Sequence, residues 1–507
     1  MWFYIAIFVF LAFSNGVSTD VPGKNTLFIC FRNRLAFVDC PGPFNPPNNI
    51  STKVVYPVSN DTVTFPTGYN CVYQINVPQG WSSYVVVTAI PSSNLTNSPI
   101  LQVIDFNQNV ESFQYVRFEK FYFIAPGGRI KLSTQTTNVT FLFSVQWYSN
   151  LTVYQPTFLN VSASDTQPVT VDLSTVNCHV TAETRASAVT IPLDSIYTIE
   201  DQRSTLRSIF IFDGPNENTT CLGSAYQLFN SNRQFVSTGK TLTVVQLQPS
   251  TYYSSSILLI QDFENTKEIG QYRGVGSLGD LPIVMDASKQ SSAFSTYSFG
   301  GLSSDCLVNI TGTGTLDVYY GGKTESKSNL IASYSESSNG LNLPQKIRGV
   351  VRTYALTGGI ATVQIVPNSV CGLLKHNVAG FITSREYKTN LTLRYSEDRQ
   401  SYYSDGPFNY TLNIQNVDLS QNKSLSLSIY NNHTGVVNFV YNSSNPPSLN
   451  TVVSGVGNEM EVIYSSPYSN SKKGGFYIDF TATKVEKSAA KYFDFIVICA
   501  ILWIGLF

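Results

Sequence analysis

The chain has 507 residues, of which 13% are charged, with 32 Lys and Arg against 33 Asp and Glu. No basic run exceeds two residues, so the concentrated basic face that nucleic-acid binding needs is absent and that class of function is excluded. The length suffices for three or four domains with cores of their own, whose polar surface must be built from Ser, Thr and Asn.

The N-terminal residues 1–16 are predicted to be a secretory signal peptide. An unbroken apolar run from Trp2 to Phe13 is followed by the small residues Ser14 and Gly16, as signal peptidase requires. No Lys or Arg precedes the run, so an N-terminal membrane anchor is the alternative. Residues 17–38 follow without clear periodicity, and we expect them to be disordered or to pair through Cys30 with another molecule.

Four stretches of chain combine apolar runs rich in β-branched and aromatic residues with turns of Gly, Pro, Asn and Ser, a pattern typical of strands. The clearest stretch runs from Ile209 to Val245. A glycine opens the second apolar run of each copy, at Gly128, Gly239, Gly359 and Gly457. This period of about 100–120 residues predicts tandem domains. The alternative is a chance recurrence of glycine and valine pairs in an all-β chain.

The expected domains are β-sandwiches of antiparallel sheets. Their predicted ranges are residues 39–150, 155–270, 275–375 and 380–485.

The cysteines are expected to form disulfides, because the chain has no CxxC pair that would indicate zinc binding. In a secreted chain each bond typically contributes about 2–4 kcal/mol of stability. Proximity in the sequence suggests the pairs Cys40–Cys71, Cys178–Cys221 and Cys306–Cys371. Other pairings stay open, since sequence alone does not fix them.

Asn-x-Ser/Thr triplets without an intervening proline are frequent, and each is a glycosylation acceptor in a secreted protein. The predicted sites are Asn49, Asn60, Asn94, Asn138, Asn150, Asn160, Asn218, Asn309, Asn390, Asn409, Asn422, Asn432 and Asn442.

The C-terminal residues 488–507 are predicted to be a glycosylphosphatidylinositol attachment signal, with the lipid on Ser488. The apolar run from Phe495 to Phe507 is shorter than the roughly 20 residues of a membrane-spanning helix. Attachment within Thr481-Ala482-Thr483 would leave a spacer of ordinary length, but these residues lie in the expected last strand. A short tail-anchored transmembrane helix or a buried terminal strand would also account for the apolar run.

No catalytic residue, cofactor or metal ligand is predicted. The three histidines, at 179, 376 and 433, do not have the spacing of a metal site, and no G-x-S-x-G motif marks a nucleophile. The acidic pairs Glu397-Asp398 and Glu459 with Glu461 are interpreted as solvent-facing. The ring pairs Tyr252-Tyr253 and Tyr402-Tyr403 are either binding surfaces or pairs in which one ring packs into the core.

A family resemblance is carried by Asp39-Cys40-Pro41-Gly42-Pro43 and by Cys71-Val72-Tyr73-Gln74-Ile75-Asn76-Val77-Pro78. These residues resemble the CUB-like domain of secreted nematode proteins, whose second cysteine lies in a C-x-Y-x-I-x-V-P strand. The last unit, from Asn458 to Phe480, is similar to the closing strands of CUB domains. The resemblance implies tandem CUB-like, jelly-roll-like antiparallel β-sandwiches in an all-β chain, an extracellular setting, and an association with innate defence.

Together these features predict a non-enzymatic, glycosylated and lipid-tethered protein on the extracellular face of the plasma membrane. Its CUB-like modules are expected to bind a protein or carbohydrate ligand, with microbial surfaces as one source, and no nucleic acid. The alternatives are an ectoenzyme, a hydrolase with a dispersed active site, and a passive surface-coat glycoprotein. A single-pass tail anchor or full secretion would replace the lipid tether.

Overall fold

The structure is a computed structural model of the whole chain. It describes residues 40–49, 52–58, 63–93, 99–149, 156–172, 177–192, 199–247, 256–276, 281–298, 304–335, 342–367, 371–385, 387–388, 397–420, 422–465 and 474–486. Two compact units, Met1–Pro41 and Gly42–Phe507, divide the chain, and all the described sheets belong to the second. The expected signal peptide, Cys30, Ser488 and the apolar tail lie outside the described residues. With 63% strand and 4% helix, the predicted all-β fold class is confirmed.

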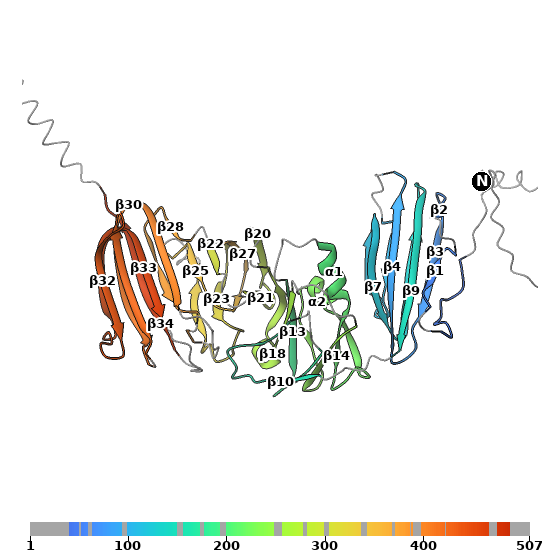
Figure 1. The fold of residues 1–507 in the computed structure, drawn as a ribbon, viewed down its shortest axis with the longest axis horizontal. Coiled ribbons are helices and arrows are strands. Elements are labelled where there is room, and N and C mark those ends of the chain that lie inside the picture. The colour runs from blue at the N-terminus through green and yellow to red at the C-terminus, as the bar shows by residue number, and fades with distance from the viewer. Residues whose placement is uncertain are drawn as a thin grey trace, which may run out of the picture. The chain divides into compact units, whose positions relative to one another are not determined.

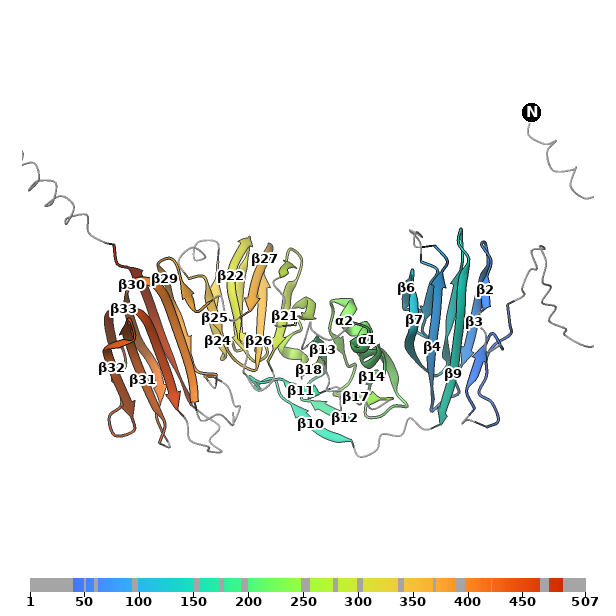
Figure 2. The same ribbon diagram turned by 45° about the horizontal axis from the view of Figure 1, so that its top comes forward.

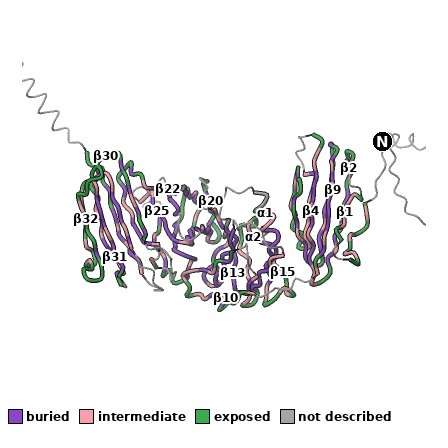
Figure 3. The backbone as a smooth tube through the Cα atoms, in the orientation of Figure 1, coloured by how far each residue is buried: buried purple, intermediate pink, exposed green. Residues whose placement is uncertain are grey.

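The first sandwich packs two antiparallel sheets over one core (Figure 1). Sheet A joins, in order, β3 (Asn70–Asn76), β8 (Gly127–Ser133), β5 (Leu101–Ile104) and β6 (Val110–Phe113). Sheet B joins β1 (Val54–Tyr56), β9 (Val139–Ser149), β4 (Trp81–Pro91) and β7 (Val116–Ile124), with β2 (Val63–Phe65) also paired to β9. Successive strand residues point to opposite faces, so Cys71, Tyr73 and Ile75 of β3 are all buried. Figure 3 shows buried residues along β4 and β9.

The second sandwich has the same two-sheet plan with two helices added. Sheet C joins β10 (Thr157–Val161), β12 (Cys178–Ala182), β17 (Thr241–Gln246), β14 (Ile209–Asp213) and β15 (Thr220–Ser224). Sheet D joins β11 (Val169–Asp172), β18 (Ser256–Asp262), β13 (Ala186–Pro192) and β16 (Phe235–Val236). The helices α1 (Ile199–Arg207) and α2 (Ala225–Ser231) lie side by side next to β14 (Figure 2), and one 3-10 turn (Phe263–Asn265) follows β18.

The third sandwich repeats this plan again. Sheet E joins β19 (Ile269–Gly274), β21 (Ser291–Tyr297), β26 (Val351–Thr357), β23 (Thr315–Tyr320) and β24 (Leu330–Tyr334). Sheet F joins β20 (Leu281–Asp286), β27 (Ile360–Pro367), β22 (Asp305–Gly312) and β25 (Gln345–Ile347). Inside the core, Asp305 of β22 and Arg352 of β26 form an ion pair in which neither side chain is exposed.

Strand order shows that these three sandwiches are repeats of one topology. The order β3-β8-β5-β6 in the first corresponds to β12-β17-β14-β15 in the second and to β21-β26-β23-β24 in the third. The second and third add a parallel edge strand, β10 or β19, where the first has only a parallel bridge between Phe44 and Ile75. Gly239 precedes β17, but Gly359 precedes β27, which corresponds to β18. The glycine used to align the third copy, Gly359, therefore lies one strand later than the corresponding position in the second copy.

Sheets D and E, from neighbouring sandwiches, pack against each other. Their shared core contains Val189 and Ile191 of β13, Ile257 and Leu259 of β18, and Ile269, Tyr272, Ala293, Tyr319, Val351 and Ala355 from sheet E. Sheet D also faces sheet C through the core of the second sandwich, and sheet E faces sheet F through that of the third. Four sheets thus form one stack, C-D-E-F, in which D and E are buried on both faces.

The fourth unit is one seven-stranded sheet folded over itself, where two sheets were expected. It joins β29 (Val378–Thr383), β34 (Gly475–Lys484), β30 (Glu397–Asp418), β33 (Thr451–Ser465), β31 (Ser424–Asn431) and β32 (Thr434–Asn442), with β28 (Leu373–Leu374) parallel to β30. The 22-residue β30 bends at an irregularity between Tyr403 and Phe408. Because β30 and β33 run through both halves, residues of β34 and β31 share one core.

The expected Cys178–Cys221 disulfide is wrong, because both cysteines are free and buried. Cys178 faces the core between sheets C and D, whereas Cys221 packs with Phe210 and Phe212 on the opposite face of sheet C. Their strands are also three positions apart, or roughly 14 Å at the usual strand spacing. Bonded cysteines need Cα atoms within about 7 Å.

The other two expected disulfides are supported. Cys306 and Cys371 are bonded, with their Cα atoms 5.6 Å apart. Cys371 lies just before β28, so this bond links the third sandwich to the fourth sheet. Cys40 and Cys71 are both disulfide-bonded, in agreement with the expected pair.

The thiols of Cys178 and Cys221 are expected to react with iodoacetamide only after unfolding. Burial raises the pKa of each thiol to about 12. The reactive thiolate is then about a thousandfold rarer near neutral pH than for a thiol three pKa units lower. Alkylation at pH 8 with and without denaturant, read by peptide mass spectrometry, checks this expectation. Rapid labelling of either cysteine in the folded chain would contradict it.

Candidate functional site

The candidate site lies where the first sandwich contacts the second, between the β5–β6 turn and α2. A capping box starts α2, in which the Ser224 side chain accepts from the Gln227 backbone and the Gln227 side chain accepts from the Ser224 backbone. This fixes Gln227, whose amide nitrogen donates to Asp105 in the turn. Asp105 also accepts from the backbone and side chain of Asn109, at 2.8 and 2.9 Å. The start of the helix and the turn therefore hold each other in place.

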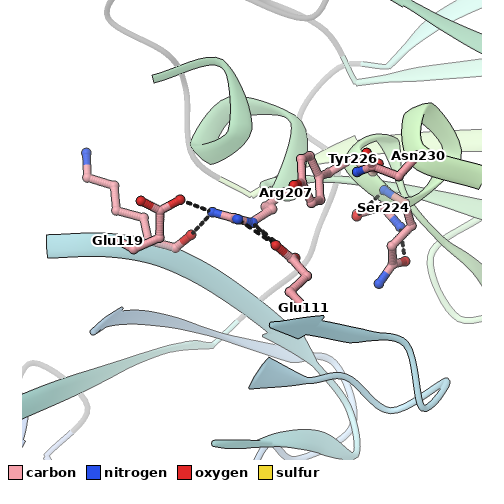
Figure 4. A network of polar contacts seen from close by, with 8 residues as sticks. Glu111, Glu119, Arg207, Ser224, Tyr226 and Asn230 are labelled. Atoms are coloured by element: carbon pink, nitrogen blue, oxygen red, sulfur yellow. Dashed lines mark hydrogen bonds and ion pairs between the residues drawn. The ribbon is translucent and has the colours of Figure 1, made fainter. Parts of the chain in front are cut away.

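Arg207, the last residue of α1, connects the two sandwiches (Figure 4). Its Nε donates to both carboxylate oxygens of Glu111, at 3.1 and 3.0 Å, and its Nη2 donates to one of them at 2.5 Å. Its Nη1 donates to Glu119 at 2.6 Å and to the carbonyl oxygen of Lys120 at 3.2 Å. The Arg207 side chain is 3% exposed. Its guanidinium therefore binds groups of this chain and is not accessible to a ligand.

Aromatic rings enclose the Arg207 guanidinium. Its Cζ lies 4.4 Å from the ring centre of Phe121 on β7 and 4.7 Å from that of Tyr226 on α2. Such cation–π contacts are strongest where water is excluded. Nearby, Ile124 of the first sandwich packs with Phe210 and other apolar residues of the second. The junction therefore combines an apolar contact with a buried charge cluster.

The two carboxylates at the junction are structural. Burial raises the pKa of Glu111, and the charge of Arg207 partly opposes this rise. Glu111 and Glu119 are both bonded to Arg207, so neither is free to act as a general acid or base. The enclosed hollow beside Arg207 measures about 30 Å³, room for roughly one water molecule.

An open groove of about 500 Å³ runs along the same junction. It is lined by Asn109, Val110, Glu111, Ser112 and Phe113 of the first sandwich and by Arg203, Tyr226, Gln227, Asn230 and Ser231 of the second. Among the described residues, the half-buried Arg203 makes no hydrogen bond or close ion pair, and its charge acts at longer range on Glu111. Amides, hydroxyls, one uncommitted guanidinium and two rings give the groove donors, acceptors and an apolar wall. Such a surface suits a polar ligand of extended shape.

The structure places nine of the thirteen predicted glycosylation sites, and all nine asparagines are exposed. These are Asn49, Asn138, Asn160, Asn218, Asn309, Asn409, Asn422, Asn432 and Asn442. Asn60, Asn94, Asn150 and Asn390 lie outside the described residues. Glycosylation itself stays a prediction.

Two interpretations of acidic residues were wrong. Asp398 is buried and bonded to Arg348 of the third sandwich at 2.6 Å, and Glu461 is buried beside Arg399 at 3.1 Å. In the ring pair, Tyr402 is buried and Tyr403 is exposed. No three His, Cys, Asp or Glu side chains gather as a metal site within the described ranges.

The groove residues were missed by the sequence analysis. Arg203 and Arg207 belong to a helix in a region interpreted as β, and the two carboxylates that bind Arg207 lie about ninety residues earlier. One available signal was overlooked, because Ser224 followed three residues later by Gln227 is the sequence signature of a helix start. Nothing comparable marked Glu111.

Comparison with known families identifies three parts of the chain. Residues 36–150 match the family described as CUB-like domain, so a CUB-like domain is present. Residues 160–247 and 264–368 match two separate families, DUF7592 and DUF7591, each described as a domain of unknown function. The CUB-like identity of the other units stays a prediction. No curated protein matches the chain.

Solved structures similar to the chain include CUB-domain proteins and a viral jelly roll protein. The CUB1-EGF-CUB2 domain of human MASP-1/3 is 10% identical, with a TM-score of 0.17, covering 41% of this chain and 100% of that one. The same domains of rat MASP-1 are 10% identical, with a TM-score of 0.15 and coverages of 40% and 97%. An archaeal virus protein with a triple jelly roll fold is 8% identical, with a TM-score of 0.15 and coverages of 85% and 87%.

The described part of the chain contains no helix long and apolar enough to cross a membrane.

Proposed function

We propose that this chain, with its CUB-like domain at residues 36–150, is an extracellular recognition glycoprotein that binds its ligand in the groove between the first two sandwiches. The observation that carries the proposal is the groove's lining, in which Arg203 makes no hydrogen bond to any described residue and lies beside exposed amides. Binding without chemistry is proposed, because the only carboxylate in the groove, Glu111, is engaged by Arg207.

The chemistry of the groove favours a glycan that carries an acidic group. A guanidinium binds carboxylate or sulfate groups through two parallel hydrogen bonds. The side-chain amides of Asn109 and Asn230 are able to bond sugar hydroxyls, and the ring of Tyr226 offers an apolar face. CUB-like domains are binding modules, and the resemblance to nematode defence proteins supports a microbial surface as the first source of such a glycan to test.

Arg203→Ala is expected to weaken ligand binding about tenfold or more, since a hydrogen-bonded charge contributes roughly 1.5–3 kcal/mol. The full chain, displayed on cultured cells, is titrated with labelled bacteria and with sulfated and carboxylated oligosaccharides. Lys240→Ala is the charge-matched control, because Lys240 is exposed on the second sandwich and lies outside the groove lining. Equal binding by Arg203→Ala and the wild-type chain would contradict ligand binding in the groove. The absence of saturable binding to every probe would contradict glycan recognition.

The proposal includes a lipid tether at Ser488 in place of the apolar tail. Phosphatidylinositol-specific phospholipase C is expected to move most of the protein from the detergent phase to the aqueous phase in Triton X-114 partitioning. A known glycosylphosphatidylinositol-anchored protein digested in parallel shows that cleavage is complete. Retention of this chain in the detergent phase under those conditions would favour the tail-anchored alternative.

A further inference from the structure

An exposed aromatic ring marks the outer face of sheet C. Phe158, on the edge strand β10, is 77% exposed. It is paired in register with His179 of β12, and the two rings stack with centroids 5.2 Å apart. The His179 ring is fixed by a hydrogen bond between its Nδ1 and Oγ1 of Thr243, 2.9 Å apart. Thr243 in turn donates to the carbonyl oxygen of Gly214 at 2.7 Å. The underside of Phe158 is therefore supported while its other face is open.

The predicted glycosylation site Asn160 lies on the same face of the same strand. Leu159 and Val161 point into the core between sheets C and D, so Phe158 and Asn160 must point outward. Two residues along a strand place their Cα atoms about 6.6 Å apart, close to the width of one sugar ring. Beside Asn160 lies an open hollow of about 230 Å³, lined among others by Thr181 and Glu183.

We propose that an N-linked glycan on Asn160 is seated on this face, with its first N-acetylglucosamine against the Phe158 ring. The C–H face of a sugar ring is apolar and packs on an aromatic face, while its hydroxyl and acetamide groups meet the polar hollow. This inference rests on the extracellular setting of the proposed function. In the attachment step, Asn160 Nδ2 loses a proton and bonds to C1 of the sugar, and the diphosphate of a lipid-linked oligosaccharide donor leaves.

The seated glycan protects an open sheet edge. Strand β10 has five residues and, among the described strands, pairs on one side only, with β12. Unpaired edges invite pairing with other chains unless something covers them. The glycan both shields this edge and holds β10 on the sheet, which explains why a large ring is left outside the core at this position.

A double-mutant cycle on the full chain, expressed in glycosylating cells, tests the proposal. Glycopeptide mass spectrometry first measures occupancy at Asn160 and at the other exposed sites. Phe158→Ala is then compared in the glycosylated chain and in the Asn160→Gln chain by chemical denaturation. Coupling between ring and sugar is expected to make the loss in the folding equilibrium constant about three- to tenfold larger when the glycan is present.

A matched control comes from the same sandwich. Asn218 is also an exposed predicted site, but the residue two positions before it is Asn216 rather than an aromatic residue. Asn218→Gln is therefore expected to show no coupling with Phe158→Ala. Amide hydrogen exchange in β10 is expected to quicken in Asn160→Gln and not in Asn218→Gln.

The outcomes separate the two proposals. An occupied Asn160 with additive mutational effects would overturn the seated glycan and leave the extracellular function standing. An empty Asn160 beside other occupied sites would overturn it as well. A chain with no occupied site at all would count against the extracellular setting, and the seated glycan would fail with it.

Discussion

Arg352→Met is expected to lower the free energy of unfolding of the third sandwich by about 3–5 kcal/mol, because it leaves a buried carboxylate without its partner. Nε and Nη2 of Arg352 each donate to Asp305 at 2.9 Å. Tyr354 and Thr296 also donate to Asp305, at 2.9 and 2.5 Å. These two neutral hydroxyls cannot replace the lost positive charge. Chemical denaturation of the full chain measures the loss in unfolding free energy, and calorimetry provides a second measurement.

Two comparison variants sharpen this test. Lys289→Met removes an exposed charge from the same sandwich and is expected to change stability by less than about 0.5 kcal/mol. Replacing Arg352 by Met and Asp305 by Leu together is expected to recover most of the loss, since burying no charge avoids the desolvation cost. A loss below about 1 kcal/mol for Arg352→Met alone would show that the pair is not holding the core together.

Arg207→Met is expected to weaken the junction of the first two sandwiches by about 3–5 kcal/mol. It leaves the buried Glu119 and the half-buried Glu111 without the guanidinium that binds both of them. Each 1.4 kcal/mol corresponds to about a tenfold change in the opening equilibrium. Amide hydrogen exchange in β6 and α2 is therefore expected to quicken by about a hundredfold or more, while strands within each sandwich keep their protection.

Two matched variants separate charge from packing. Glu111→Gln is expected to cost only about 1 kcal/mol, because Arg207 keeps its ion pair with Glu119 and the glutamine carbonyl oxygen still accepts a hydrogen bond. Arg233→Met, which replaces an exposed arginine of the second sandwich, is expected to leave exchange unchanged.

The junction defect also has an expected pH dependence. In Arg207→Met, Glu111 loses the charge that most strongly opposes its raised pKa, so the folded state binds a proton at Glu111 more tightly than the unfolded state. The stability due to this binding is present at low pH and lost as the pH rises through the raised pKa. The exchange defect should therefore shrink on acidification, and a defect that is independent of pH would point to lost packing alone.

The sequence predicted strands best where one face of a sheet meets the core. In β3, Cys71, Tyr73 and Ile75 are buried, whereas the residues between them, Val72 and Gln74, are exposed or half-buried. In β18 all seven residues are buried, because sheet D has a core on each side, and alternation disappears. In the third copy the predicted repeat was aligned to the wrong strand. The correct correspondence is seen only from the order of strands in the sheets.

Contacts between sandwiches could not be predicted from the sequence. The error at Cys178 and Cys221 arose because closeness along the chain does not tell which face of a sheet a side chain takes. Asp398 looked solvent-facing because its partner, Arg348, comes from another unit. Arg207 likewise meets Glu111 only through the packing of two folded sandwiches, and no spacing motif encodes such a meeting.

The shared core of sheets D and E bears on how this architecture is inherited. If either middle unit were transferred alone to another protein, apolar side chains such as Ile257 and Tyr272 would be left facing water. The second and third sandwiches match two different families. Because they share a core, we expect them to be inherited together. We expect natural rearrangements of this architecture not to break the chain between β18 and β19.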